Sequence, residues 1–138
     1  MRIMGLDIGE KWIGVALSDP IGILATPLTR ISATPVEQTV ETINRLISDN
    51  DVSRIVAGMP YSMDGSTGHQ AQRVQDVLDI LAPHVDVPIE ICDERLTSVA
   101  AERRMMEAGL GRQKRREHID ATAAAVILQG YLDQQPSP

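Results

Sequence analysis

Phenylalanine is absent from this sequence, and aromatic residues of any kind are few. Among its 138 residues, the aromatic side chains are Trp12, Tyr61 and Tyr131. Proteins that hold single-stranded nucleic acids by base stacking depend on aromatic platforms, so this scarcity argues against that mode of binding. If the protein binds a nucleic acid, we expect contacts with the sugar–phosphate backbone rather than with the bases.

Cysteine and long apolar segments are also scarce. Cys92 is the single cysteine, which excludes an intramolecular disulfide and is typical of a reducing compartment. No run of about 18 apolar residues is present, which argues against a membrane-spanning helix. Asp7 comes too early for a secretory signal peptide. These features predict a cytoplasmic protein without membrane contact.

The composition is otherwise that of one globular domain, with 43% apolar and 23% charged residues. We expect residues 1–133 to form a single domain and the polar, proline-containing tail 134–138 to be frayed. The net charge of −6 argues against general binding of polyanions. Basic residues are nevertheless concentrated, since six of the thirteen lie within one short segment: Arg103, Arg104, Arg112, Lys114, Arg115 and Arg116.

The apolar pattern predicts three strands at the start of the chain, over 2–8, 12–18 and 21–28, the last ending near Pro27. Short connections between them indicate an antiparallel meander. Helices and strands then alternate: a helix with a capping box at 34–37 that ends near 49–50, a strand at 54–58, a helix through 71–81, a strand at 89–93, and helices at about 97–108 and 119–132. The last helix is apolar nearly all round, so it is expected to pack against the sheet. The order predicts an α/β fold with one five-stranded mixed sheet and helices on both faces.

Three acidic residues are candidates for chemistry. Asp7 interrupts an apolar strand, where an ionised carboxylate is costly unless it is paired or binds a cation, and Gly5 and Gly9 are expected to leave room for a ligand. Glu94 follows the last strand, at the sheet edge where α/β proteins bind ligands. Asp120 is expected in the first turn of the last helix.

Each acid also has a structural explanation. Asp7 could cap a turn, and the helix dipole would favour Asp120 in a first turn. Asp93 and Glu94 could form a solvated pair with Arg95 as ion-pair partner. Because neighbouring strand residues point to opposite faces, Asp93 and Glu94 cannot serve one site equally.

If Asp7, Glu94 and Asp120 converge, their oxygen-only ligand set suits Mg²⁺ or Mn²⁺. Two such ions could hold the attacking and leaving oxygens of a phosphoryl displacement. Histidines and cysteine show no zinc spacing, so we expect surface or packing roles for His69, His84 and His118 and a core position for Cys92.

Two further segments could contact a nucleic acid. The connection 59–68 is long for a strand-to-helix loop, and Ser62, Ser66 and Thr67 with its glycine N–H groups suit phosphate oxygens, although a flexible surface loop is the alternative. It lacks the ending of a P-loop. Basic residues just before Asp120 could hold a polyanion at an acidic site or could be a solvated face. The residues expected to bind the sugar–phosphate backbone of the nucleic acid are Arg95, Arg112, Lys114, Arg115 and Arg116.

Four motifs in order resemble those of one known family. They are the opening GLDIG of 5–9 with GVALSD at 14–19, GMP at 58–60 with DGS at 64–66, DERLTS at 93–98 with Ala101 and Glu102, and IDA at 119–121 with Ala124 and ILQ at 127–129. Together these motifs, which span nearly the whole chain, resemble the YqgF/RuvX family, described as pre-16S rRNA nucleases related to Holliday-junction resolvases.

This resemblance implies an RNase H-like fold and a nuclease that hydrolyses phosphodiesters. By motif match, Asp7, Glu94 and Asp120 would be its metal-binding catalytic acids. The implied role is 5′-end maturation of 16S ribosomal RNA, with pre-16S rRNA and ribosome precursors as partners. Resolution of branched DNA is the alternative within the nuclease hypothesis, and the sequence leaves monomer and homodimer open.

Two other functions remain to be weighed. Sugar kinases and actin-like proteins also begin with a strand carrying Asp-Ile-Gly, but they close a second domain over ATP, for which 138 residues leave no room. A non-catalytic RNA-binding module on the same fold is the other alternative. Three retained acids argue against it, because negative charge near phosphates does not help binding.

Overall fold

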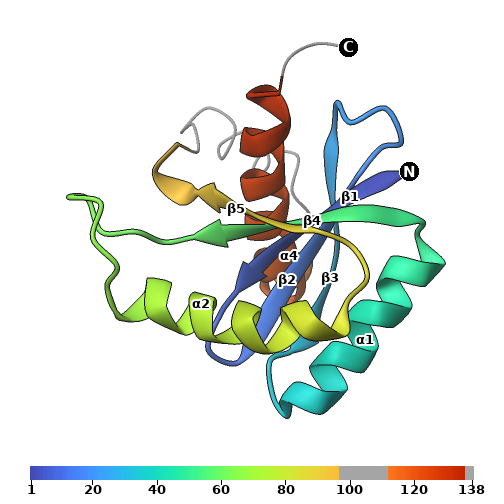
Figure 1. Ribbon diagram of the computed structural model, residues 1–138. Helices are drawn as coiled ribbons and strands as arrows, with labels where there is room; N and C mark the ends of the chain where they lie inside the picture. The colour runs from blue at the N-terminus through green and yellow to red at the C-terminus, as the bar shows by residue number, and fades with distance from the viewer. Residues whose placement is uncertain (97–111, 136–138) are drawn as a thin grey trace.

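In the computed structural model, which describes residues 1–96 and 112–135, five strands form a mixed sheet in the order β3-β2-β1-β4-β5 (Figure 1). Pairing is antiparallel between β1 and β2 and between β2 and β3, and parallel from β1 through β4 to β5. The predicted α/β sheet is therefore confirmed. Its strands are β1 (Arg2–Ile8), β2 (Trp12–Ser18), β3 (Ala25–Ser32), β4 (Val52–Met59) and β5 (Ile89–Asp93). The helices are α1 (Val36–Asp49), α2 (His69–Leu81) and α4 (Arg112–Asp133), with short 3-10 turns η1 (Ala82–His84) and η2 (Glu94–Leu96).

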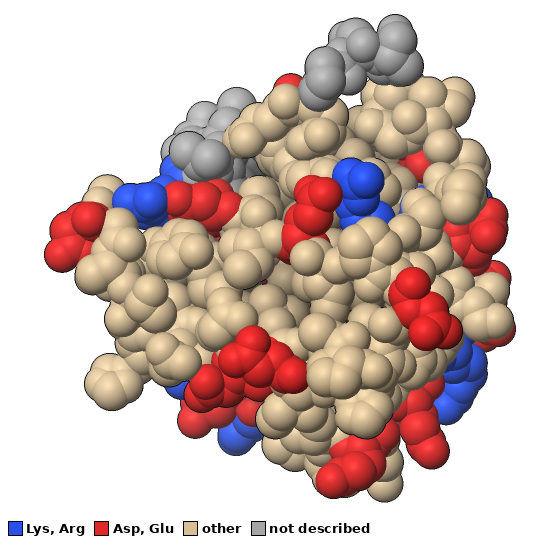
Figure 2. All heavy atoms as spheres, in the orientation of Figure 1, with Lys and Arg blue, Asp and Glu red and all other residues tan. Residues whose placement is uncertain are grey.

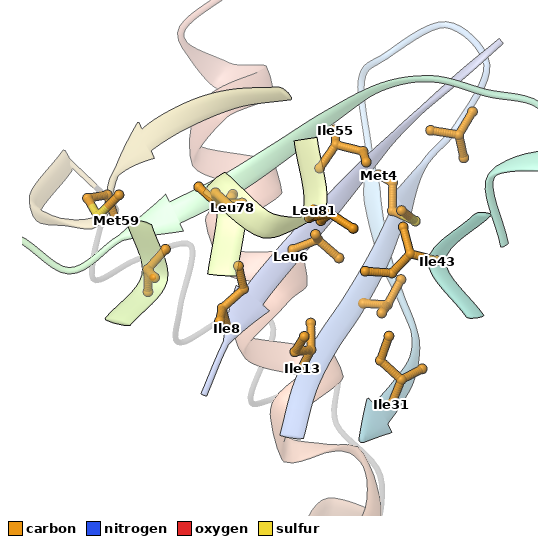
Figure 3. Close-up of a cluster of buried hydrophobic side chains, with 14 of the residues drawn as sticks. Met4, Leu6, Ile8, Ile13, Ile31, Ile43, Ile55, Met59, Leu78 and Leu81 are labelled. Atoms are coloured by element: carbon orange, nitrogen blue, oxygen red, sulfur yellow. The ribbon is translucent and has the colours of Figure 1, made fainter. Parts of the chain in front are cut away.

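Helices cover both faces of the sheet, α1 and α2 on one and α4 on the other (Figure 1). Alternation along β1 assigns its residues to the two faces. Met4, Leu6 and Ile8 join the core beneath α1 and α2 (Figure 3). The residues between them, Gly5 and Asp7, consequently face α4.

Two glycines bring α4 close to the sheet. A Cβ at Gly14 would lie 1.8 Å from the carbonyl oxygen of Asp120, and one at Gly5 would lie 2.8 Å from Cβ of Leu128. Any side chain at these positions would push the helix outward. The expectation that Gly5 leaves room for a ligand is therefore wrong, because α4 fills that space.

The third strand lies four residues later than predicted at both ends. Residues 21–24 form a turn, in which the carboxylate of Asp19 accepts N–H bonds from the backbone of 22–24 at 2.7–3.1 Å. Pro27 does not end the strand, because β3 is an edge strand and its register with β2 shifts beside the proline. Pairing then continues as far as Ser32.

The predicted capping box at the start of α1 is wrong. Pro35 is the N-cap residue in extended conformation, and no side chain caps the helix. Thr34 therefore lies one position too early to cap. The body of α1 and the buried stripe of α2 through Ala71, Val74, Leu78 and Leu81 are as predicted.

The final helix begins earlier than predicted, at Arg112 rather than near 119. The basic residues at 112–116 are consequently helical instead of forming a loop, which agrees with the high helix propensity of Arg, Lys, Gln and Glu. Asp120 lies eight positions inside the helix, so the helix dipole does not account for it. The predicted helix at 97–108 lies outside the described residues.

The sequence also predicts where the domain ends and that no helix spans a membrane. α4 ends at Asp133, where the sequence places the end of the domain, while the frayed tail and the single-domain division stay predictions. Within the described part of the chain, no helix combines the length and the apolar character needed to cross a membrane.

Candidate active site

A row of paired residues crosses the sheet on the face covered by α4. Asp7 of β1 pairs with Gly14 of β2, and Gly14 pairs with Arg30 of β3. Directly paired residues share a face of the sheet, so Asp7 and Arg30 lie on either side of the bare glycine. The backbone of α4 at Asp120 packs directly on Gly14. Asp120 therefore lies between Asp7 and Arg30.

Asp120 interacts with both neighbours in the row. Its Oδ2 atom lies 3.5 Å from Nη1 of Arg30. Its charge also contributes to raising the pKa of Asp7, after the larger effect of burial on that half-buried carboxyl. The first strand and the last helix therefore place two carboxylates within electrostatic reach of each other.

Glu94 approaches the same place from the end of β5. It is the first residue of η2, and its Cγ would lie 3.1 Å from a Cβ at Gly58, so the glycine makes space for this side chain over β4. Burial raises the pKa of Glu94 to about 7, with smaller contributions from the charges of Asp7 and Asp93. A carboxyl with this pKa exchanges its proton near neutral pH.

Asp93 and Glu94, although adjacent, have different environments. The guanidinium of Arg95 donates to both carboxylate oxygens of Asp93, with Nη2 at 2.6 Å and Nε at 3.0 Å, and this hydrogen bonding lowers the pKa of Asp93. Glu94 has no such partner among the described residues and faces Asp7. The structure thus places Glu94, rather than Asp93, beside Asp7.

Arg95 also contacts the loop that joins β4 to α2, which spans 60–68. Its Nη1 atom donates to the carbonyl oxygen of Met63 at 3.5 Å, and its guanidinium lies 5.7 Å from the ring centre of Tyr61. These contacts hold the loop beside η2. The guanidinium expected to bind a nucleic acid is therefore engaged within the protein.

The predicted hydroxyl residues of this loop are exposed, and none of them lines the cleft beside Asp7 and Glu94. The N–H of Ser62 donates to the carbonyl of Ser66 at 3.0 Å, and the hydroxyl of Ser66 donates to Asp64 at 2.7 Å. Gly65 completes the turn with φ of 88°, in the left-handed region that favours glycine. Thr67 is exposed next to this turn.

A cleft of about 290 Å³ opens beside the first strand. Two acidic groups predicted from the sequence line it, Asp7 and Glu94, and Arg73 contributes a positive charge on the α2 side. Asp120 is not among its lining residues. The full lining is Asp7, Ile8, Gly9, Glu10, Pro60, Gln70, Arg73 and Glu94.

Sequence reasoning missed Gln70, Arg73 and Arg30. A signal for the first two exists, since they lie three positions apart at the start of the helix that follows the long loop, beside the buried stripe of α2. Arg30 had none, because the predicted third strand ended before it.

The remaining predicted residues lie away from the cleft or outside the description. His69 and His84 are exposed, as expected, and Cys92 is buried beside α4. The backbone of residues 112–118 is helical, but the side chains of these residues are not described. The predictions for His118 and for the basic residues Arg112, Lys114, Arg115 and Arg116 therefore lie outside the described part of the chain.

The acids fit a divalent cation only in part. Among the described side chains, those of residues 1–95 and 119–135, no three His, Cys, Asp or Glu groups lie closely enough together to hold a metal ion, so the expected three-acid cage is not preformed. Asp120 is paired with Arg30 instead. Asp7 and Glu94, however, are half-buried oxygen ligands whose charges oppose each other. A hard divalent cation would relieve that repulsion, so this pair suits Mg²⁺ or Mn²⁺.

Comparison with known proteins agrees with this architecture. RuvC of Thermus thermophilus superposes with a TM-score of 0.61 at 13% identity, covering 96% of this chain and 94% of that protein. The Holliday junction resolvase of fowlpox virus gives a TM-score of 0.57 at 11% identity, covering 96% and 98%. Likeness at this level of identity establishes the fold, which is RNase H-like, as the motifs implied.

Sequence relatives are much closer. A protein of Roseiflexus sp. is 49% identical over 134 residues, which cover 97% of this chain and 95% of the relative. One of Desulforamulus reducens is 47% identical over 133 residues, covering 96% and 97%. Both carry the name "Putative pre-16S rRNA nuclease". The family profile described as "RuvX: Holliday junction resolvase" matches residues 1–134. The chain therefore belongs to the RuvX family.

Proposed function

We propose that this protein is a metal-dependent nuclease that hydrolyses phosphodiesters during 5′-end maturation of pre-16S rRNA. The observation that carries this proposal is the pair formed by Asp7 and Glu94, two half-buried carboxylates that line one cleft and whose pKa values are raised. Two ionised carboxylates this close repel each other in the metal-free protein, and a divalent cation bound between them would compensate their charge. The names of the relatives at 47–49% identity support RNA processing.

Asp7 and Glu94 would hold Mg²⁺ or Mn²⁺, and Asp120, beside Asp7, would complete the site. When bound, one or two such ions activate water for attack on phosphorus and stabilise the leaving oxygen. In the metal-free protein Glu94 holds a proton near neutral pH, because its pKa is about 7, so binding of a cation there would displace that proton. Arg73 on the opposite wall is placed to offset the negative charge of a phosphate that enters the cleft.

The substrate backbone would approach along the rim of the cleft. On the face shown in Figure 2, acidic side chains form several groups with few lysines or arginines among them, so this face would repel a polyanion. The loop residues Ser62, Ser66 and Thr67 and the basic segment 112–116 remain the predicted binding elements. Arg95 would act indirectly, by holding the loop.

Branched DNA is the second candidate substrate. The RNase H-like fold shared with two Holliday junction resolvases and the description of the family favour it. A non-catalytic RNA-binding module remains a weaker alternative, because the acidic cleft would oppose phosphate. A cytoplasmic location, a ribosomal partner, and a monomer or homodimer remain predictions.

The test is cleavage of a labelled RNA carrying the 5′ leader of pre-16S rRNA, with Mg²⁺, Mn²⁺ or EDTA. We expect metal-dependent cutting that Asp7→Asn abolishes without changing the circular dichroism spectrum. Asp86→Asn is the matched control, because Asp86 is exposed and remote from the cleft.

A four-way DNA junction tested in parallel ranks the two substrates. Cutting of the junction alone would replace RNA with branched DNA in the proposal. Metal-independent RNA binding without cutting of either substrate would favour the binding module. Cutting by Asp7→Asn at the wild-type rate would remove the acid pair from the mechanism.

A further inference from the structure

Arg30 lies between an aromatic ring and a carboxylate at the edge of the acidic site. Its guanidinium carbon is 4.0 Å from the ring centre of Trp12, and its Nη1 atom is 3.5 Å from Oδ2 of Asp120. About a third of each side-chain surface is exposed to solvent, 33% for Arg30 and 31% for Asp120. The stacking holds the guanidinium in place independently of the carboxylate.

The strand register makes this arrangement specific. Arg30 and Asp7 are both partners in the row through Gly14, and α4 places Asp120 over that glycine. The same carboxylate therefore has a guanidinium on one side and a second carboxylate on the other. A cation bound at Asp7 and the guanidinium of Arg30 would compete for Asp120.

We propose that Arg30 is a built-in counter-ion that holds Asp120 in the metal-free protein and gives it up when a divalent cation binds at Asp7. This inference rests on the metal site of the proposed function. Arg30 is a positioning residue in this scheme, because it acts on the site through Asp120. An arginine suits this role, since it stays charged at every relevant pH and keeps its stack on Trp12 while the carboxylate leaves.

The strength of the pair is suited to such an exchange. Partly exposed ion pairs are weak because water screens them. A divalent cation that gains a carboxylate ligand can therefore displace the guanidinium. Removing the arginine should tighten metal binding by about two- to fivefold, the range that a screened ion pair allows.

Trp12 offers a direct readout, because it is the only tryptophan of the chain. We expect its fluorescence to change saturably as Mg²⁺ is added to the wild-type protein, since the group stacked on the ring loses its ion-pair partner. Asp7→Asn should abolish this change, which assigns it to the acidic site. In Arg30→Gln the fluorescence change should be lost, while titration calorimetry shows Mg²⁺ bound two- to fivefold more tightly than by the wild type.

Two variants make the result specific. Arg30→Lys restores a competing charge and should return the Mg²⁺ affinity towards the wild-type value. Arg45→Gln removes an exposed arginine of α1, on the other face of the sheet, and should leave both the affinity and the fluorescence change unaltered. Thermal unfolding of each variant verifies that it is folded.

Unchanged or weaker Mg²⁺ binding by folded Arg30→Gln would overturn the exchange and leave the metal site standing. No Mg²⁺ binding by the wild-type protein would overturn the exchange together with the metal site of the proposed function. Calorimetry of the wild-type protein distinguishes these two failures without any measurement of cleavage.

Discussion

Replacing Glu94 with glutamine should stabilise the metal-free protein at alkaline pH. The pKa of this carboxyl is raised from 4.5 to about 7, chiefly by burial. Between these two values the unfolded chain releases a proton that the folded protein retains, so the free energy of unfolding falls as pH rises. Below about pH 4.5 both states are protonated and the cost is absent. Above about pH 7 it is fully present.

The size of this effect follows from the two pKa values. Fully expressed, the shift would correspond to roughly 3 kcal/mol. Because the side chain is only half-buried and water screens its charge, we reduce this to about 1 kcal/mol. Glutamine has nearly the same shape and no charge, so Glu94→Gln should be about 1 kcal/mol more stable than the wild type at pH 8 and equally stable at pH 4.5.

The assay is urea unfolding followed by circular dichroism at pH 4.5, 6 and 8 in EDTA, with Glu41→Gln as the control on the exposed side of α1. Mg²⁺ should then reverse the order at pH 8, because it stabilises the wild type by binding the folded state and gains less from the variant. A variant less stable than the wild type at pH 8, or a difference that does not change with pH, would refute the reasoning.

Two further predictions concern the helix and the basic segment. Gly14→Ala should destabilise the protein by about 1–3 kcal/mol in urea unfolding, because its Cβ would lie 1.8 Å from the carbonyl oxygen of Asp120 and α4 must move away; an unaltered midpoint would show that α4 does not rest on this glycine. Reversing Arg115 and Arg116 to glutamate should weaken binding of labelled leader RNA in anisotropy titrations and lower the salt slope by roughly 0.7–0.9 for each lost phosphate contact. An unchanged slope would remove the basic segment from the binding surface.

The sheet could be predicted largely from apolar periodicity, because its strands must bury side chains on both faces. β1, β2 and β5 begin and end where the pattern indicates. The third strand could not be placed in the same way, since Pro27 is a breaker in most contexts and only the irregular register with β2 accommodates it. Arg30 lies beyond that proline, so a strand that ends near Pro27 does not include it and the sequence does not predict its position.

For the candidate site, too, some features could be predicted from the sequence and others depend on tertiary contacts. Motif order nominates Asp7, Glu94 and Asp120 as site residues, which stays a prediction, and it does not predict how these side chains are held. That Asp93 pairs with Arg95 while Glu94 turns to Asp7 depends on where β5 gives way to η2. That Asp120 is paired with Arg30 depends on the close approach of α4 at Gly14, which is a tertiary contact without a local sequence signal.

The dependence of the site on α4 has a consequence for protein synthesis. Asp7 belongs to the first strand and Asp120 to the last helix, so the acidic site requires a contact between nearly opposite ends of the chain. A nascent chain that has not yet extruded α4 leaves the apolar face at Val56 and Cys92 uncovered and lacks one of the three acids. If Asp120 completes the proposed site, docking of the last helix is the step that finishes it, and we expect no cleavage of RNA before translation of the chain is nearly over.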